Sequence, residues 1–388
     1  MSLSAASTVP AAPHSTSPRA LPAWVYRNAE MTRLEMQRLI GTSWQILCHV
    51  SDLPRHGDYV TLEIANESIF AVRDREGGIR AFHNVCRHRG AKMLDGHGNC
   101  PGAITCPYHG WSYKLDGALI GLPLKDTFPD LDRSSHGLVP VRVETFMGFV
   151  YVCINGNPQP VKDLWGDMAR ELEPYRFGEM VPIAPFYQEI WEADWKIAMD
   201  NYLESYHVPI GHPGLNRMFT PDFQDQASRP GIARGNSWLK TTPSSRWSER
   251  TYQHLVRSTV THLPGKLRSC WSFYSILPNL GIDVFPEQMD FFQVLPLEPG
   301  RALIRGGIYG LPDARPEMKL LRWLGTRINR AVNSEDRDLC ARVQRGLASS
   351  SYQPGPLSTL ECWMLEFHDL LRARIPEVRL PAAPARFA

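Results

Sequence analysis

The amino-acid sequence predicts an α+β protein in which an all-β domain precedes a domain of helices packed on an antiparallel sheet. Between about residues 45 and 155, short β-rich runs alternate with glycine, proline and aspartate turns, a texture typical of a β domain. From about residue 160 onward, helical and strand patterns mix. Strands followed by such a mixture favour the α+β class.

The N-terminal region is expected to contain a leader and one helix. Residues 1–20 are rich in Ala, Ser and Pro and have neither a basic start nor an apolar core, so they predict a disordered leader and no secretory signal. Residues 29–47 predict an amphipathic helix followed by a strand. We expect residues 21–44 to form an N-terminal helical segment that packs on the second domain.

The two domains are expected at residues 45–160 and 161–388. In the first, strands are predicted at residues 59–64, 69–73 and 149–154. In the second, helices are predicted at residues 161–173, 194–207, 315–350 and 357–375, and strands at residues 272–277, 281–285, 289–296 and 302–309.

The composition excludes several classes of partner. A formal charge of +2 gives no reason to expect nucleic acid or an anionic membrane. No apolar run approaches the roughly 18 residues that a membrane span needs. Eight scattered cysteines in 388 residues are too few for a disulfide scaffold, so a reduced, cytoplasmic protein is expected.

The segment 194–212 carries a candidate metal site. Apolar residues at intervals of three and four predict a helix up to His207, on which Glu204 and His207 share one face. Pro209 and Gly211 then end the helix, so the chain can turn back and bring His212 to the same point. Two imidazoles and one carboxylate with open positions suit ferrous iron that binds dioxygen. Two histidines five residues apart are also common as unrelated surface or core residues.

A second candidate metal site lies upstream. Cys86 and His88 are followed, after the seventeen residues 89–105, by Cys106 and His109. One zinc ion would take all four side chains, whereas a Rieske [2Fe–2S] cluster places two cysteines on one iron and two histidines on the other. Spacing alone does not separate these readings, although zinc pairs usually read Cys-x2-Cys or His-x3–5-His.

Two residues between these pairs are competing ligands for the upstream site. His97 is expected in an exposed glycine-rich turn, and Cys100 as an inert small residue.

The stretches 84–90 and 106–113 resemble the cluster-binding loops of Rieske non-haem iron oxygenases, catalytic alpha subunits, and the segment 194–212 resembles the mononuclear-iron motif of the same family. The resemblance runs from about residue 22 to the C-terminus, with both motifs in the family's order. It implies a Rieske [2Fe–2S] domain, a helix-grip (START-like) catalytic domain, and two cofactors, a [2Fe–2S] cluster and a mononuclear Fe(II). Respiratory-type Rieske proteins carry additional cysteines in these loops, and this chain has none there.

The resemblance also implies residue roles. His207 and His212 match the iron histidines, and Asp336 matches the third ligand, with Glu335 and Asp338 as alternatives. An acidic cluster at the start of a helix, favoured by the helix dipole, is the alternative interpretation of these three carboxylates. Glu204 matches a carboxylate that links an iron histidine to a cluster histidine of the neighbouring subunit.

Asp200, one turn earlier on the same face, is the alternative to Glu204 for this link. A carboxylate between two imidazoles would fix their tautomers and give electrons a short path.

Electrons are expected to come from a separate NAD(P)H-dependent flavin or iron–sulfur reductase, because no glycine-rich dinucleotide loop follows a strand in the chain. The resemblance implies a homotrimer in which each cluster serves the iron of the next subunit.

The substrate is expected to be a small molecule, oxidised with O2. A glutamate at position 204 and the run 343–361 resemble the branch that acts on carnitine, choline or glycine betaine, whose quaternary cations suit aromatic walls. Aromatic residues after the iron histidines are candidates for the pocket: Tyr206, Phe219, Phe273, Tyr274, Phe285, Phe291, Phe292 and Trp363.

Two other functions stay open. An aromatic-ring hydroxylating dioxygenase or O-demethylase would use the same two metal sites. A non-catalytic Rieske electron carrier is a more distant alternative, against which the 228 residues after residue 160 argue.

Overall fold

The computed structural model describes residues 19–220 and 226–387. Most of the predicted leader, residues 1–18, lies outside this part of the chain. Arg19 and Ala20 are ordered, because they pair with Pro356 and Gly355 near the C-terminus. In the described part of the chain, no helix has both the length and the apolar character that a bilayer crossing requires.

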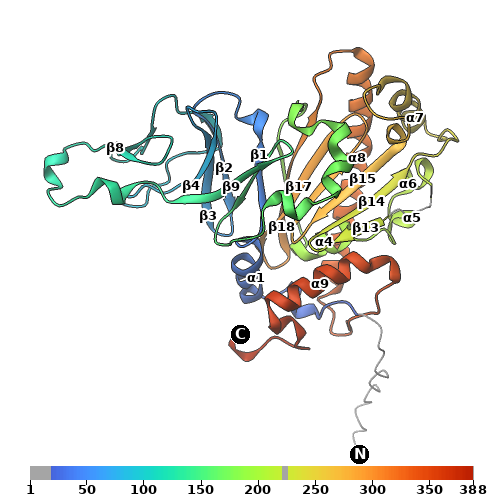
Figure 1. The fold of residues 1–388 in the computed structure, drawn as a ribbon. Helices are drawn as coiled ribbons and strands as arrows, with labels where there is room; N and C mark the ends of the chain where they lie inside the picture. The colour runs from blue at the N-terminus through green and yellow to red at the C-terminus, as the bar shows by residue number, and fades with distance from the viewer. Residues whose placement is uncertain (1–18, 221–225, 388) are drawn as a thin grey trace, which may run out of the picture.

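The first domain is a β domain, as predicted, and forms the lobe on the left of Figure 1. A seven-stranded antiparallel sheet has the order β1-β10-β9-β4-β3-β2-β5, and a three-stranded sheet, β6-β7-β8, projects from it. The strands are β1 (Gln45–His49), β2 (Asp58–Ile64), β3 (Glu67–Arg73), β4 (Ile79–His83), β5 (His97–Asn99), β6 (Ile104–Thr105), β7 (Ser112–Tyr113), β8 (Leu119–Gly121), β9 (Pro140–Phe146) and β10 (Phe149–Cys153).

The second domain contains an eight-stranded antiparallel sheet against which long helices pack (Figure 1). Its main path is β11-β18-β17-β16-β15-β14-β13, and β12 also pairs with β18. The strands are β11 (Val181–Pro182), β12 (Tyr187–Trp191), β13 (Gln226–Arg229), β14 (Ile232–Trp238), β15 (Cys270–Ile276), β16 (Leu280–Val284), β17 (Met289–Glu298) and β18 (Arg301–Gly310). The four strands predicted after residue 270 are confirmed, and β11, β12, β13 and β14 were missed.

The helices depart from prediction where local polar contacts or glycine intervene. The helix expected over residues 161–173 is divided at Gly166, whose φ of +49° suits glycine. The helix expected through His207 ends at Tyr202, because the Glu204 carboxylate accepts the backbone N–H groups of Tyr206 and His207 and starts a new turn. The helices of this domain are α2 (Val161–Trp165), α3 (Met168–Leu172), α4 (Trp195–Tyr202), α5 (Val208–Gly211), α6 (Pro213–Met218), α7 (Trp247–Thr259), α8 (Pro316–Gly346) and α9 (Cys362–Arg374).

The predicted N-terminal helix, α1 (Ala29–Glu35), lies beside α9 and is attached to α4 by a buried ion-pair group. Lys196 Nζ lies 2.8 Å from Glu35 Oε1 and 2.7 Å from Asp194 Oδ1, and all three side chains are buried. Trp195 Nε1 donates to the other oxygen of Glu35 at 2.7 Å. These contacts fix the start of α4, the helix that leads to the two histidines.

Lys196→Met should destabilise the protein by roughly 3–5 kcal/mol, because it leaves two buried carboxylates without their cation. Urea denaturation followed by circular dichroism would measure the loss. Arg33→Ala is the control, because it removes an exposed ion-pair partner of Glu30 on α1. This substitution should leave the urea midpoint unchanged. Equal effects of the two substitutions would contradict the role of the buried group.

Candidate functional site

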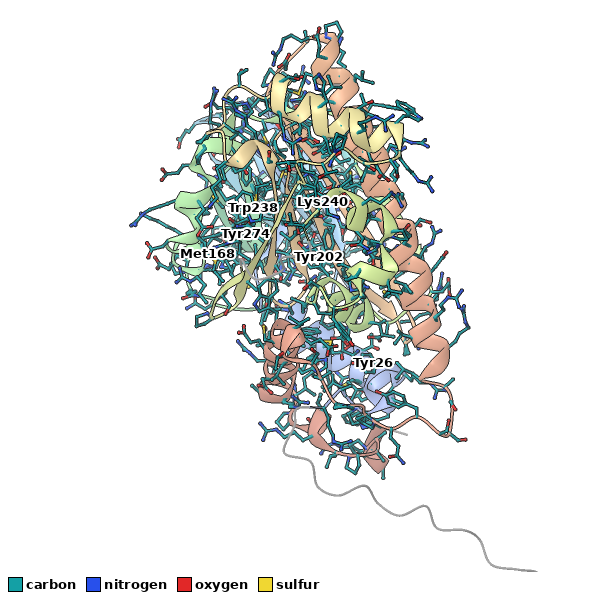
Figure 2. All side chains as sticks on the ribbon, turned by 90° about the vertical axis from the view of Figure 1, so that its right-hand side faces the viewer. Tyr26, Met168, Tyr202, Trp238, Lys240 and Tyr274 are labelled. Atoms are coloured by element: carbon teal, nitrogen blue, oxygen red, sulfur yellow. The ribbon has the colours of Figure 1, made fainter. Side chains whose placement is uncertain are left out.

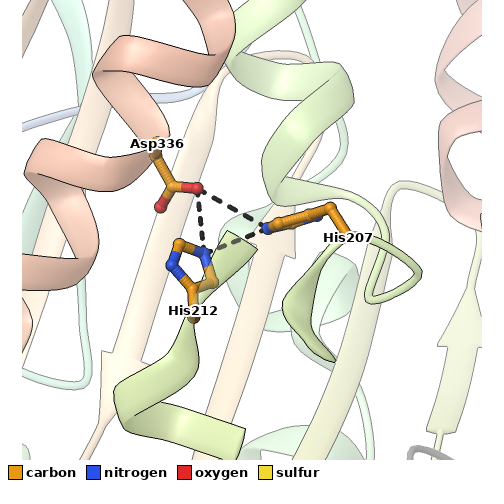
Figure 3. A group of neighbouring side chains, drawn as sticks. All are labelled: His207, His212 and Asp336. Atoms are coloured by element: carbon orange, nitrogen blue, oxygen red, sulfur yellow. Dashed lines mark hydrogen bonds and ion pairs between the residues drawn. The ribbon is translucent and has the colours of Figure 1, made fainter. Parts of the chain in front are cut away.

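Two histidines and one aspartate converge between α4 and α8 (Figure 3). His207 precedes α5, His212 lies between α5 and α6, and Asp336 lies on α8. His207 Nε2 is 3.1 Å from His212 Nε2, and Asp336 Oδ1 is 3.5 and 3.0 Å from these two nitrogens. The short α5 reverses the chain, which brings two histidines five residues apart to one point.

A carboxylate lies behind each imidazole. His207 Nδ1 donates to Glu204 Oε1 at 2.5 Å, and His212 Nδ1 donates to Glu335 Oε2 at 2.8 Å. These hydrogen bonds place a proton on each Nδ1 and leave each Nε2 as an acceptor. Two Nε2 lone pairs and a carboxylate oxygen then face one another, an arrangement that repels itself unless a cation lies between them.

The electrostatics of the site favour a positive charge between these three side chains. Burial lowers the pKa of His207, but hydrogen bonds with Asp336 and Glu204 outweigh burial and raise this pKa to about 9. Burial opposes ionisation of Asp336, yet its contacts with both imidazoles hold its pKa below the usual value. Ligand atoms about 3 Å apart match neighbouring positions around an ion with bonds of about 2.1 Å. The donor set therefore fits a divalent metal such as ferrous iron.

The competing acidic residues have other positions. Asp338 is largely exposed and lies 3.8 Å from Arg337. Glu335 contacts the Nδ1 side of His212 and not the converging atoms. Asp200, the alternative to Glu204, accepts hydrogen bonds from Tyr26 and His368, away from both histidines.

The four upstream residues lie in two loops of matching conformation. In each loop the cysteine carbonyl accepts a hydrogen bond from a glycine N–H four residues later, Gly90 in one and Gly110 in the other, with φ of +73° and +74°. The cysteines are buried, and the histidine Nδ1 atoms face each other at 3.1 Å. Two buried sulfur donors and two imidazoles across a loop pair fit a Rieske cluster.

Aromatic residues surround these loops. Trp111 stacks on His88 with ring centroids 4.9 Å apart, and Tyr108 stacks on His109 at 3.8 Å. Tyr113, whose hydroxyl group lies 3.4 Å from Cys86 Sγ, is in hydrogen-bonding reach of the sulfur, a contact that the sequence did not single out.

The two residues that competed for the upstream site lie apart from the four. His97 is exposed on β5, and Cys100 follows that strand and is half-buried.

A cavity of about 190 Å³ adjoins the three converging residues, between the sheet and α4 to α8. Of the predicted aromatic residues, Phe219, Phe273, Phe292 and Trp363 line it.

Four of the predicted pocket residues do not line the cavity. Tyr206 is exposed. Phe291 and Tyr274 are buried in the core on the opposite face of the sheet, because successive strand residues point to opposite faces. Phe285 is buried just past the end of β16, where its ring packs against Trp271 with centroids 4.5 Å apart.

Several residues that line the cavity were not singled out from the sequence. Tyr187, Asp283 and Asp290 point from β12, β16 and β17 into the cavity, and Tyr202 enters it from α4. Figure 2 labels Tyr202 and Tyr274, and the Tyr202 hydroxyl oxygen lies 3.2 Å from the Tyr274 carbonyl oxygen. A predicted strand register with Phe292 facing the cavity would have selected Asp290 as well.

Comparison with known proteins gives two family matches. Residues 177–377 match the ring hydroxylating alpha subunit (catalytic domain), and residues 43–142 match the Rieske [2Fe-2S] domain. The first match argues against a non-catalytic electron carrier.

Two curated relatives cover most of the chain. A carnitine monooxygenase oxygenase subunit of Escherichia coli (strain K12) is 39% identical over 86% of this chain and 85% of its own. A glycine betaine monooxygenase oxygenase subunit of Chromohalobacter salexigens is 30% identical over 90% of this chain and 84% of its own.

The fold also matches a solved structure of a quaternary ammonium Rieske monooxygenase, described for carnitine oxidation and inter-subunit electron transfer. Its TM-score is 0.79 at 25% identity, with 92% of this chain and 96% of that chain covered. The predicted family, α+β fold and cofactors are therefore confirmed. This chain belongs to the Rieske non-haem iron oxygenases as a ring-hydroxylating alpha subunit, an oxidoreductase that uses O2, a [2Fe–2S] cluster and a mononuclear iron.

Proposed function

We propose that this terminal oxygenase oxidises a small, betaine-like quaternary ammonium compound. The observation that carries the proposal is the convergence of His207, His212 and Asp336 beside a cavity with aromatic walls, in a chain whose relatives are named for carnitine and glycine betaine. Aromatic faces attract a quaternary cation. No observation on this chain favours an aromatic-ring dioxygenase or an O-demethylase over this function.

The three converging residues would hold the iron, and Cys86, His88, Cys106 and His109 would hold the cluster. Iron bound there would supply dioxygen activation. In the reaction, one oxygen atom of O2 enters an N-methyl C–H bond as a hydroxyl group, and the other leaves as water with two electrons and two protons. The resulting carbinolamine loses formaldehyde.

Electron delivery is proposed to cross a subunit boundary in a homotrimer. The cluster loops and α5 lie in opposite lobes of one chain (Figure 1). We therefore expect the cluster of a neighbouring subunit to donate electrons to each iron. Glu204 holds His207 through one oxygen, while its other oxygen accepts two backbone N–H groups. The remaining acceptor capacity of Glu204 is proposed to receive a cluster histidine, His88 or His109, of the neighbouring subunit.

The electrons are proposed to reach the cluster from a separate NAD(P)H-dependent flavin or iron–sulfur reductase. We propose a reducing, cytoplasmic location, in which Cys86 and Cys106 stay available as thiolate ligands. We also propose domain limits at residues 45–160 and 161–388, with 21–44 as a helical segment on the catalytic domain.

Alanine at His207, His212 or Asp336 should abolish turnover and remove the mononuclear iron, because each change deletes one of three ligands. Iron-to-sulfide ratios and the paramagnetic signal of the reduced cluster would separate the two metals, and the cluster signal should persist. Asp338→Ala is the matched control on the same helix and should retain both metals. Iron and turnover retained in Asp336→Ala but lost in Asp338→Ala would reverse the assignment.

Glu204→Gln should load both metals and yet slow cluster oxidation by roughly 10- to 100-fold in a single turnover with O2 and substrate. The amide keeps the length but loses the charge that orients His207. Glu204→Asp should lose less, since the charge survives. Glu335→Gln removes the carboxylate behind the other imidazole and is the control. Cluster oxidation at the wild-type rate in Glu204→Gln would remove this residue from the electron path.

The reaction itself is tested by O2 uptake with NADH and a reductase, over betaines and aromatic acids, with formaldehyde and hydrogen peroxide both measured. Formaldehyde in proportion to O2 consumed with a trimethylammonium compound is the expected result. The proposed substrate class would be wrong if every trimethylammonium compound gave only hydrogen peroxide and an aromatic acid were hydroxylated.

A further inference from the structure

The cavity wall carries two carboxyl groups that the iron site does not use. Asp283 on β16 and Asp290 on β17 are direct cross-strand neighbours, and both line the cavity. Only 5% of Asp290 is exposed. Like charges directly opposite each other destabilise an antiparallel pair, so this arrangement needs a compensating partner.

In the described part of the chain, the hydrogen-bond donors to these two carboxyl groups are neutral side chains. Asp283 Oδ1 accepts a hydrogen bond from the Tyr202 hydroxyl at 2.8 Å, and Asp290 Oδ2 accepts one from Asn329 Nδ2 at 3.2 Å. Asp290 Oδ1 is buried and, apart from the neighbouring Asp283 carboxyl group, has no partner in the described part of the chain. One buried acceptor is thus left aimed at its acidic neighbour.

The pair retains a proton near neutral pH. Burial raises the pKa of Asp283 to about 7, and burial together with the Asp283 charge holds the pKa of Asp290 well above its usual range. Two interacting carboxyl groups of this kind share a proton and together carry at most about one negative charge near neutral pH.

No lysine or arginine of the described cavity wall offsets that charge. Arg305, on the adjacent strand β18, donates to the carbonyl groups of Ile46 and Leu47 and to Gln293 on the opposite face of the sheet. Glu189, another acidic lining residue, is paired with Arg337.

Aromatic rings lie beside the pair. Tyr202 and Phe292 are in edge-to-face contact, with ring centroids 4.6 Å apart, and Tyr187 lies close enough for both aspartates to raise its pKa, although burial is the larger cause. Carboxyl groups together with aromatic walls attract a cation and repel an anion.

We propose that Asp283 and Asp290 recognise the cationic group of the substrate, and that the cavity selects cations without a carboxylate over zwitterions such as glycine betaine and carnitine. The inference rests on the proposed function and narrows its substrate class. A quaternary ammonium group supplies the positive charge that the pair lacks. A substrate carboxylate would meet further acidic groups, and no lysine or arginine is present in the described wall.

The position of the pair relative to the proposed iron ligands suits this role. Asn329, the partner of Asp290, and Asp336 lie seven residues apart on the same face of α8, and both line the cavity. Seven residues correspond to about two helical turns, or roughly 10 Å. A small cation beside the pair therefore has its N-methyl groups directed into the space that leads to His207, His212 and Asp336.

Matched ligands separate charge from shape. Choline and glycine betaine share the trimethylammonium group, but choline carries a hydroxymethyl group where glycine betaine carries a carboxylate. The compound 3,3-dimethylbutan-1-ol has the shape of choline without its positive charge. L-carnitine and its methyl ester form a second pair. Anaerobic calorimetric titration of the holoenzyme should show each cation binding at least roughly tenfold more tightly than its zwitterionic or neutral counterpart.

Variants test whether the pair causes this preference. Asp283→Asn and Asp290→Asn keep the shape of a protonated carboxyl group, and each should weaken choline binding at least roughly tenfold while leaving the affinity for 3,3-dimethylbutan-1-ol unchanged. Glu287→Gln is the control, because Glu287 is a buried acid in the β16–β17 turn that does not line the cavity. It should alter neither affinity, and an intact cluster spectrum verifies folding of every variant.

The outcomes distinguish this inference from the proposed function. Glycine betaine that binds as tightly as choline and releases formaldehyde would overturn the inference and leave the function standing. A cation preference that survives Asp283→Asn/Asp290→Asn would also overturn the inference. Absence of binding by every trimethylammonium compound would overturn both. Preference for choline that is lost in the aspartate variants and kept in Glu287→Gln would establish the pair as the specificity element.

Discussion

The active centre depends on one constraint, that two imidazoles must present the same nitrogen to one point. Glu204 and Glu335 impose it by accepting the Nδ1 protons of His207 and His212, which leaves both Nε2 atoms facing Asp336. Several features of the fold serve this requirement. α4 ends at Tyr202, five residues before the first histidine, and the single turn of α5 reverses the direction of the chain. A continuous helix would have directed the two imidazoles to different faces.

Buried hydrogen bonds between the two domains fix the position of the Rieske domain relative to the catalytic domain. Arg305 of β18 donates to the carbonyl groups of Ile46 and Leu47 on β1, and its pKa is lowered to about 10 by burial. Its partner Gln293 donates to Gln45, again on β1, at 2.7 Å. A buried polar network of this kind loses its hydrogen bonds if the two sheets slide past each other. The orientation of the Rieske domain on the catalytic sheet is thereby specified.

The sequence predicted the features that depend on local pattern. Strand alternation located the later strands, and residue spacing indicated both groups of proposed metal ligands. Features set by tertiary contact were not predictable in this way. The early end of α4 depends on how the Glu204 side chain folds back, and Glu335 meets His212 only because α8 crosses behind α5. Phe291 and Phe292 are adjacent in sequence and equally apolar, so only the sheet register decides which of them faces the cavity.

The 31-residue helix α8 places Asn329, Glu335 and Asp336 on one rigid body. One residue added to or removed from the helix between positions 329 and 336 would rotate its two ends by about 100° relative to each other. The proposed iron ligands and the two aspartates of the cavity wall would then no longer share a cavity. Side-chain replacements along α8 can therefore change the substrate range of this scaffold. Insertions or deletions between positions 329 and 336 cannot do so, because they separate the two sites.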